Sequence, residues 1–171
     1  KYNTKMEDFG CIQHDDYYYI GASPDGINVD KSSQRYGRML EIKNVVNREI
    51  TGIPKEEYWI QMQVQMETCN LNECDFLETQ FSEYESEEEF LSDDSDKMKG
   101  LLLYFMENGK PLYKYMPLEY TKYDDMISWE NKTIDAHSHL TWVKTIYWRL
   151  DKVSCVLVLR SYASSTVGRA W

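Results

Sequence analysis

The pattern of apolar and polar positions predicts a series of short strands near the start of the chain. Residues 16–22 are rich in Tyr and Ile and are expected to form the first strand. Residues 23–26, Ser-Pro-Asp-Gly, form a turn signal, because Pro restricts φ and Gly accepts positive φ. Residues 27–29 are then expected to return as the paired strand. After a polar loop, residues 38–43 alternate again, with Met39 and Glu41 on the face opposite Leu40 and Ile42.

A helix is predicted next, over residues 55–69. This segment contains neither Gly nor Pro, and Pro54 is suited to the first turn of a helix. Tyr58, Met62, Met66 and Cys69 recur at helical spacing. The Asn-rich residues 70–72 are expected to end the helix.

The rest of the chain continues to mix strands with helices. A strand is expected over residues 74–81, and a hairpin over 100–106 and 111–116 turns at Asn108-Gly109, a pair that accepts positive φ. Residues 118–137 favour a helix, and two strands at 142–149 and 153–160 are expected to be joined by Leu150-Asp151-Lys152. No element is assigned to residues 161–171. The expected fold is therefore α/β, a mixed central sheet flanked by helices.

Length and composition are those of one globular domain spanning residues 1–171. The chain has a mass of 20.4 kDa, and 14 Tyr and 5 Trp give it an aromatic content of 14%. No run of about 18 apolar residues is present, so no membrane contact is expected. No secretion signal is visible at the start of the chain.

The formal net charge of −10 is unusual for a nucleic-acid binder. Residues 82–97 hold eight Asp or Glu against one Lys, so this segment accounts for most of the excess. We expect it to be an exposed acidic insertion without regular structure, a surface that mimics nucleic acid or recruits a partner. The charge argues against strong nonspecific binding of DNA.

The four Cys residues form no C-x-x-C pair and no regular framework. They are expected to be reduced core residues of a protein in an intracellular, reducing compartment. His137 and His139 have no Cys or carboxylate at the spacing that a zinc site requires, so a surface position at the end of a helix is expected.

Candidate chemistry lies with Asp25, Glu41, Lys43 and Gln61. Hydrolysis of a phosphodiester needs a divalent cation, and Mg²⁺ prefers oxygen ligands from one or two carboxylates. Glu41 and Lys43 are two residues apart on a strand, so both side chains leave the same face. The carbonyl of Ile42 lies between them as a third protein ligand, and Lys43 is suited to orient or deprotonate a water.

Each of these signals has an ordinary explanation when it is taken alone. Glu41 and Lys43 fit a solvated strand face, and Asp25 fits a turn. Gln61 and Gln65 are four apart on the predicted helix and fit a polar face.

Together, three segments resemble the YqaJ and lambda-type alkaline exonuclease family of the PD-(D/E)XK nuclease superfamily. They are GASPDGI at residues 21–27, LEIK at 40–43 and YWIQMQVQM at 58–66, in the order and with the gaps of the family motifs. The resemblance implies a restriction-endonuclease-like core. It implies that Asp25, Glu41 and the Ile42 carbonyl bind metal, that Lys43 is catalytic and that Gln61 supports the site. Gln65 is left open.

The resemblance further implies a Mg²⁺- or Mn²⁺-dependent exonuclease that resects duplex DNA ends from 5′ to 3′ in viral or phage recombination or genome processing. Double-stranded DNA ends, a homo-oligomer and a single-strand annealing protein are the partners implied, in the cytoplasm or nucleus of a host cell. Two alternatives stay open. One is an endonuclease of the same fold acting on branched DNA or RNA, and the other is a noncatalytic binding module.

Family members carry a helical portion before the first motif strand, with a further acidic residue near the metals. Only 24 residues precede Asp25 here. We expect this portion to be missing from the chain; the alternatives are that another chain supplies it or that full activity has been lost.

Overall fold

The computed structural model describes residues 4–161, in two compact units. Of the described residues, the first unit comprises 4–79 and 153–161, and the second comprises 80–152. Strands β6 and β9 each continue from one unit into the other, so the single domain expected from the sequence stays a prediction. Residues 162–171 of the unassigned tail lie outside the described residues.

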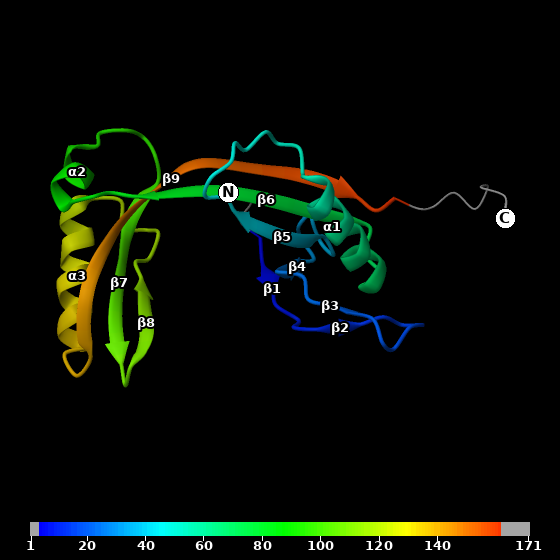
Figure 1. The fold of residues 1–171 in the computed structure, drawn as a ribbon, viewed down its shortest axis with the longest axis horizontal. Coiled ribbons are helices and arrows are strands. Elements are labelled where there is room, and N and C mark those ends of the chain that lie inside the picture. The colour runs from blue at the N-terminus through cyan, green and yellow to red at the C-terminus, as the bar shows by residue number, and fades with distance from the viewer. Residues whose placement is uncertain (1–3, 162–171) are drawn as a thin grey trace. The chain divides into compact units, whose positions relative to one another are not determined.

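The first unit is a mixed sheet with one long helix (Figure 1). Its strands follow the order β1-β4-β5-β6-β9, with β2 and β3 forming a separate pair. Strands β4 and β5 are antiparallel, whereas β5 and β6 are parallel and are connected through helix α1. The elements are β1 Met6–Glu7, β2 Ile12–Gln13, β3 Gly21–Ala22, β4 Gly26–Asn28, β5 Met39–Asn44, α1 Glu56–Thr68, β6 Glu73–Glu83 and β9 Thr141–Leu159.

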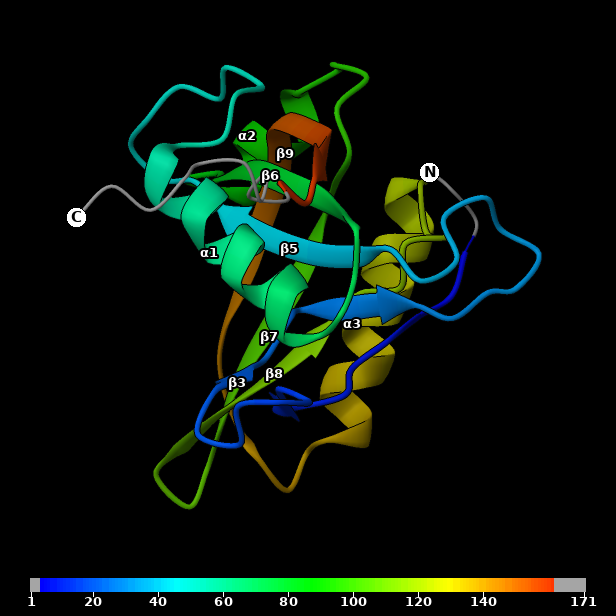
Figure 2. The same cartoon turned by 90° about the vertical axis from the view of Figure 1, so that its right-hand side faces the viewer.

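Helix α1 packs on the sheet through sulfur-containing and aromatic side chains. Met62 and Met66 of the helix meet Met39 of β5 and Phe76 of β6 in one buried cluster. Figure 2 shows α1 lying across β5. Because a parallel pair of strands needs a crossover connection, the helix both joins β5 to β6 and covers them. The predicted helix and the predicted strand alternation at Met39 and Glu41 are confirmed.

The first predicted strand, over residues 16–22, is wrong except at its end. Residues 14–20 form a loop between β2 and β3, closed by bonds from the amide of His14 to the Ile20 carbonyl (3.0 Å) and from the amide of Ile20 to the Tyr17 carbonyl (2.8 Å). Local hydrogen bonds thus replace a sheet ladder, and Tyr18 is exposed. The predicted return strand exists as β4, but it pairs with β1 and β5 rather than with this segment.

The second unit is a four-stranded sheet with two helices, in the strand order β6-β9-β7-β8. The predicted hairpin is confirmed, and positive φ at Asn108 (49°) and Gly109 (77°) forms its turn. The predicted second helix begins later than expected. The further elements of this unit are α2 Glu87–Ser92, β7 Lys99–Glu107, β8 Lys110–Tyr115 and α3 Tyr123–Ala136.

The acidic segment is ordered, so the expectation of an irregular insertion is wrong. Its carboxylates are largely exposed, but Tyr84 and Phe90 are buried in a cluster with Leu101 and Met126. Ser86 caps α2 by accepting a hydrogen bond from the amide of Glu89 (3.1 Å). Two aromatic anchors inside a run of acids supply the burial that orders the segment.

The two predicted C-terminal strands are a single strand, β9 Thr141–Leu159. Residues 150–152 make no turn, and no positive φ occurs there. Asp151 instead lies within the strand and accepts hydrogen bonds from Ser82, Lys97 (2.7 Å) and Arg149 (2.9 Å). These donors satisfy the carboxylate of Asp151, although Asp is a residue type that favours turns.

All four Cys are unpaired, but only Cys74 is fully buried and Cys11 is exposed, so the expectation of core positions is wrong for Cys11. Over residues 4–161, no helix combines the length and the apolar character that crossing a membrane requires.

Candidate active site

Asp25 and Ile42 meet in the first unit where β4 begins beside β5. Gly26 pairs with Leu40, so the residue that precedes β4 lies next to the middle of β5. The Asp25 Oδ2 accepts a hydrogen bond of 2.6 Å from the backbone amide of Ile42. The Asp25 side chain is exposed, so its carboxylate is open to a ligand.

Glu41 is a buried carboxylate held by donors on both sides. It is only 2% exposed. Its Oε1 accepts hydrogen bonds from Lys43 Nζ (2.5 Å) and from Gln61 Nε2 (2.7 Å). A buried charge is tolerated when it is paired and hydrogen-bonded, as it is here. The predicted residues Lys43 and Gln61 therefore meet at Glu41, and Asp25 reaches the backbone of the next residue in the strand, Ile42.

Gln65, which the sequence left open, is a further contact of Glu41. Its Nε2 donates to Glu41 Oε2 (3.1 Å) and lies 3.5 Å from the carbonyl oxygen of Ser23. One amide group thus links Glu41 to the segment that carries Asp25. Its Oε1 is buried and has no hydrogen-bond partner in the described part of the chain. Gln61 and Gln65 are four residues apart on α1, and this spacing in the sequence predicted that they share a helix face.

Lys43 also faces an aromatic ring. Its Nζ lies 5.2 Å from the centroid of the Tyr58 ring. The Arg48 guanidinium lies 5.6 Å from the same centroid. Arg48 donates to the carboxylate of Glu78, which is fully buried and opposite Lys43 in the parallel pair β5–β6. This hydrogen bond raises the pKa of Arg48 above its usual value.

Sequence reasoning did not find Arg48 or Glu78. The signal for Glu78 was present, since it shares a strand face with Cys74 and Phe76 and is a charge in an apolar row. No local pattern distinguishes Arg48, because its partner is 30 residues away.

The oxygen donors of the site fit Mg²⁺ or Mn²⁺. Asp25 and Glu41 supply carboxylates, the first of them bonded to the amide of Ile42, and hard divalent cations prefer oxygen ligands. Burial raises the pKa of the nearby Cys74 thiol to about 12, so it remains protonated and is a poor ligand at neutral pH. Within residues 4–161 no group of three His, Cys, Asp or Glu side chains gathers, so any ion here depends on two carboxylates and backbone or water oxygens.

The two histidines do not form a site in the described structure. The rings of His137 and His139 stack with centroids 6.1 Å apart, and His137 Nδ1 lies 2.8 Å from the carbonyl oxygen of Thr133.

Fold and site together define a class of protein. The mixed α/β architecture is consistent with a restriction-endonuclease-like core, with the carboxylates at β4 and β5 and the supporting amides on α1. Residues 1–72 match the model of the YqaJ-like viral recombinase domain. The resemblance to the YqaJ and lambda-type exonuclease family is thereby confirmed for this part of the chain.

A viral relative extends the similarity along most of the chain. Over 196 aligned positions the chain is 29% identical to "Uncharacterized protein R354" of Acanthamoeba polyphaga mimivirus. The alignment covers 91% of this chain and 36% of the relative, so the chain spans about a third of the relative's length.

Proposed function

We propose that the first unit is the catalytic centre of a metal-dependent nuclease that hydrolyses DNA phosphodiester bonds. The observation that carries the proposal is that Lys43 and Gln61 donate to one oxygen of Glu41, while Asp25 accepts from the amide of the next residue, Ile42. Asp25, Glu41 and the Ile42 carbonyl would hold Mg²⁺ or Mn²⁺. Such an ion supplies Lewis acidity toward a phosphate oxygen and makes a water more acidic.

The protein's own groups have separate tasks in this proposal. Lys43 Nζ, an ammonium paired with Glu41, orients the attacking water, whose proton passes to the surrounding solvent. Gln61 and Gln65 restrain both oxygens of Glu41, so that this carboxylate keeps one orientation when its environment changes charge. The ring of Tyr58 also restricts Lys43, whose Nζ lies 5.2 Å from the ring centroid.

In its finer form the proposal is an exonuclease that resects duplex ends from 5′ to 3′, in viral recombination or genome processing. The match to a viral recombinase domain and the viral relative support it. Double-stranded DNA ends are the proposed substrate, with a homo-oligomer and a single-strand annealing protein as proposed partners inside a host cell.

The test is hydrolysis of end-labelled linear duplex DNA in Mg²⁺, Mn²⁺ or EDTA, with closed circular DNA as a second substrate. We expect degradation of linear DNA that requires the metal and that Lys43→Ala abolishes. Lys31→Ala removes an exposed lysine of the same unit and is the matched control, with activity unchanged. The order in which labelled products appear gives the polarity.

Cleavage of closed circles would replace the exonuclease by an endonuclease. Because the chain spans about a third of its relative, the assay is repeated with the full-length mimivirus relative. Absence of metal-dependent hydrolysis in both proteins would exclude a nuclease.

A further inference from the structure

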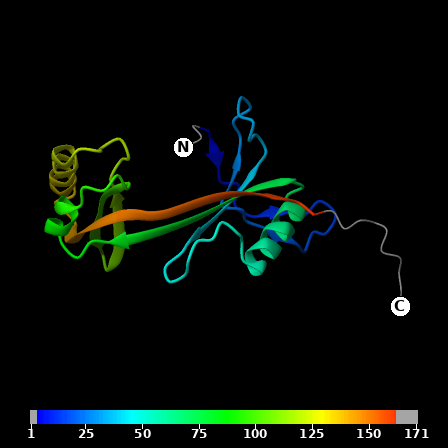
Figure 3. The same ribbon diagram turned by 90° about the horizontal axis from the view of Figure 1, so that it is seen from above.

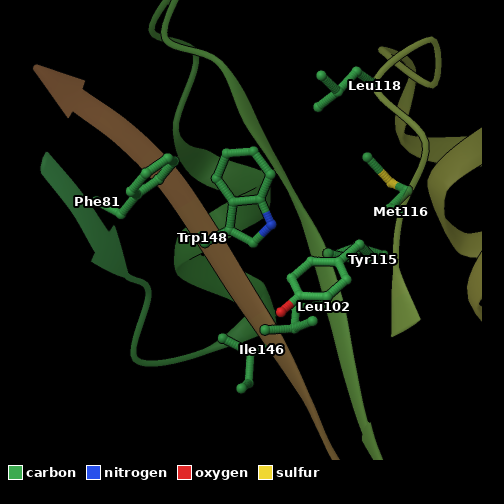
Figure 4. A pocket seen from close by; sticks show the side chains of 8 residues that line it. Phe81, Leu102, Tyr115, Met116, Leu118, Ile146 and Trp148 are labelled. Atoms are coloured by element: carbon green, nitrogen blue, oxygen red, sulfur yellow. The ribbon is translucent and has the colours of Figure 1, made fainter. Parts of the chain in front are cut away.

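A buried carboxylate with a missing partner lies in the first unit. Glu78 is fully buried, and its Oε2 accepts no hydrogen bond from the described residues. The hollow of about 420 Å³ in the second unit is different, because none of the described residues that line it is charged; Phe81, Leu102 and Trp148 are examples (Figure 4). A buried acceptor without a donor costs free energy. We therefore expect a donor to reach Glu78 Oε2 in another state of the site.

Glu78 lies beside Lys43 in the sheet. The two residues are partners in the parallel pair β5–β6, so their side chains leave the same face, the one that α1 covers. Lys43 Nζ donates to Glu41 Oε1 at 2.5 Å, and Arg48 donates to Glu78 Oε1. Among the described residues, ion pairs join Lys43 to Glu41 and Arg48 to Glu78, but not Lys43 to Glu78. Lys43 is thus the neighbouring donor that Glu78 Oε2 lacks.

The ring of Tyr58 keeps the two cations close to each other. Lys43 Nζ lies 5.2 Å from the ring centroid, and the Arg48 guanidinium lies 5.6 Å from it. Arg48 belongs to the connection from β5 to α1, which is cyan in Figure 3 and lies on the same side of the sheet as α1. Lysine has a flexible four-carbon stem, so a rotation of this side chain can change its partner without a shift of the backbone.

The charges of these side chains balance only in the absence of a metal ion. Lys43 and Arg48 then offset the two buried carboxylates, Glu41 and Glu78. A divalent ion held by Glu41 would lie close to the Lys43 ammonium, and like charges repel strongly at such distances. The ammonium then needs a second acceptor.

We propose that Glu78 is a positioning residue that receives the Lys43 ammonium when a metal ion occupies Glu41. The inference rests on the proposed function, because it requires the metal site. With Arg48 on Oε1 and Lys43 on Oε2, both oxygens of Glu78 have a donor. An ammonium has three N–H donors, so Lys43 keeps two of them for the water and the phosphate.

The experiment is a double-mutant cycle in which calorimetry measures the affinity of the full chain for Mn²⁺ without DNA. Glu78→Gln keeps the shape of the side chain and removes its charge. We expect it to weaken Mn²⁺ binding about 10- to 100-fold, the usual effect of losing a group behind a metal ligand. In a Lys43→Met background the same substitution should change the affinity about twofold or less, because no ammonium has to be received.

Glu73→Gln is the matched control. Glu73 is on the same strand and is also paired with an arginine, Arg38 (2.8 Å), so the substitution removes the same charge at a distance from Lys43. It should leave Mn²⁺ affinity unchanged. An equal loss from Glu78→Gln in both backgrounds would overturn the inference, because Glu78 would then act on the ion through its charge alone.

A second measurement needs no substitution at Glu78, so it does not depend on the folding of that variant. The ¹³C signal of the Glu78 carboxyl group is followed while Mg²⁺ is added. We expect the signal to shift in the wild type and to shift much less in Lys43→Met. Equal shifts in the two proteins would contradict the transfer of Lys43.

The outcomes separate this inference from the proposed nuclease. If Mn²⁺ binding follows the predicted cycle but no DNA is hydrolysed, the nuclease alone is excluded. If DNA is hydrolysed but Glu78→Gln has the same effect in both backgrounds, the role of Glu78 alone is excluded. A wild type that binds no Mn²⁺ would overturn both.

Discussion

At the scale of single residues, the site depends on a carboxylate that is buried yet fully provided with donors. Glu41 accepts from one lysine and two glutamines, and each donor comes from a position fixed by β5 or α1. Removing one donor leaves part of a buried charge without a partner, which costs more than the bond itself. The orientation of Glu41 is therefore sensitive to side chains that touch no substrate.

Gln65→Met tests this sensitivity, since it keeps the length of the side chain and removes its amide. We expect metal affinity or turnover to fall about 10- to 100-fold, the usual effect of losing a partner of a metal ligand. Titration with Mn²⁺, read by calorimetry, measures the affinity without reference to activity.

Gln63→Met is the control for that change. Gln63 lies on the same helix, but its amide bonds to the Leu159 carbonyl and to Ser161, away from Glu41. Its substitution should leave Mn²⁺ affinity unchanged, and an equal loss in both variants would show a general effect on α1.

A second residue-scale prediction concerns acid stability through Asp151. Burial opposes ionisation of this side chain, but hydrogen bonds from Lys97, Ser82 and Arg149 bring its pKa down to about 2 from 3.8. Because the folded-state pKa is lowered, the stabilisation is present above about pH 4 and is lost as the pH falls toward 2. Asp151→Asn should cost about 2 kcal/mol of unfolding free energy at pH 7.

Urea unfolding of the wild type and of Asp151→Asn at pH 7, 4 and 2 measures the difference in their unfolding free energies. This difference should shrink as Asp151 becomes protonated. Asp94→Asn, at an exposed position of the acidic segment, serves as the control. A constant difference at all three pH values would show that ionisation of Asp151 is not its source.

At the scale of elements, α2 shows how a six-residue helix persists within a highly charged segment. Isolated helices of this length are unstable in water, so tertiary packing must stabilise it. Phe90 contacts the rings of Tyr84 and Tyr147, and Lys99 lies over its face at 4.9 Å.

Phe90→Ala should therefore lower the unfolding free energy by about 3–5 kcal/mol and expose the acidic segment to proteases. Leu91→Ala is the matched control, since the neighbouring side chain is 48% exposed and its loss should change stability by about 0.5 kcal/mol or less. Equal effects of the two substitutions would show that the segment does not pack as described.

At the scale of the whole molecule, the proposed metal site belongs to one of the two units. The carboxylates Asp25 and Glu41 lie in the first unit. A bound metal ion should therefore protect amides of that unit, a difference that hydrogen exchange can resolve.

With Mg²⁺ at ten times its Kd, the stability of the binding-competent state should rise by about 1.4 kcal/mol. Amides near Ile42 and Gln61 should exchange more slowly, while those of residues 99–115 should not change. Glu41→Gln should remove the effect. If Mg²⁺ slows amide exchange in the second unit of the Glu41→Gln variant, the ion binds outside the proposed site.

The amino-acid sequence by itself determined the elements whose signals are local. Alternation at Met39 and Glu41, helical spacing from Tyr58 to Met66, and the Asn108-Gly109 turn each depend on near neighbours, and each is found in the structure. The motif residues Asp25, Glu41, Lys43 and Gln61 could likewise be selected from their order along the chain.

Only the tertiary structure decided the features that depend on distant partners. Tyr17 to Tyr19 have strand-forming side chains but no sheet to pack against, and Asp151 suggests a turn until donors from Ser82 and Lys97 hold it inside β9. Phe90 orders an acidic segment by burial, and Gln65 reaches Glu41 across 24 positions of sequence. Packing and long-range hydrogen bonds outweigh local preference at these residues, because burying or satisfying a side chain is worth more than its intrinsic propensity.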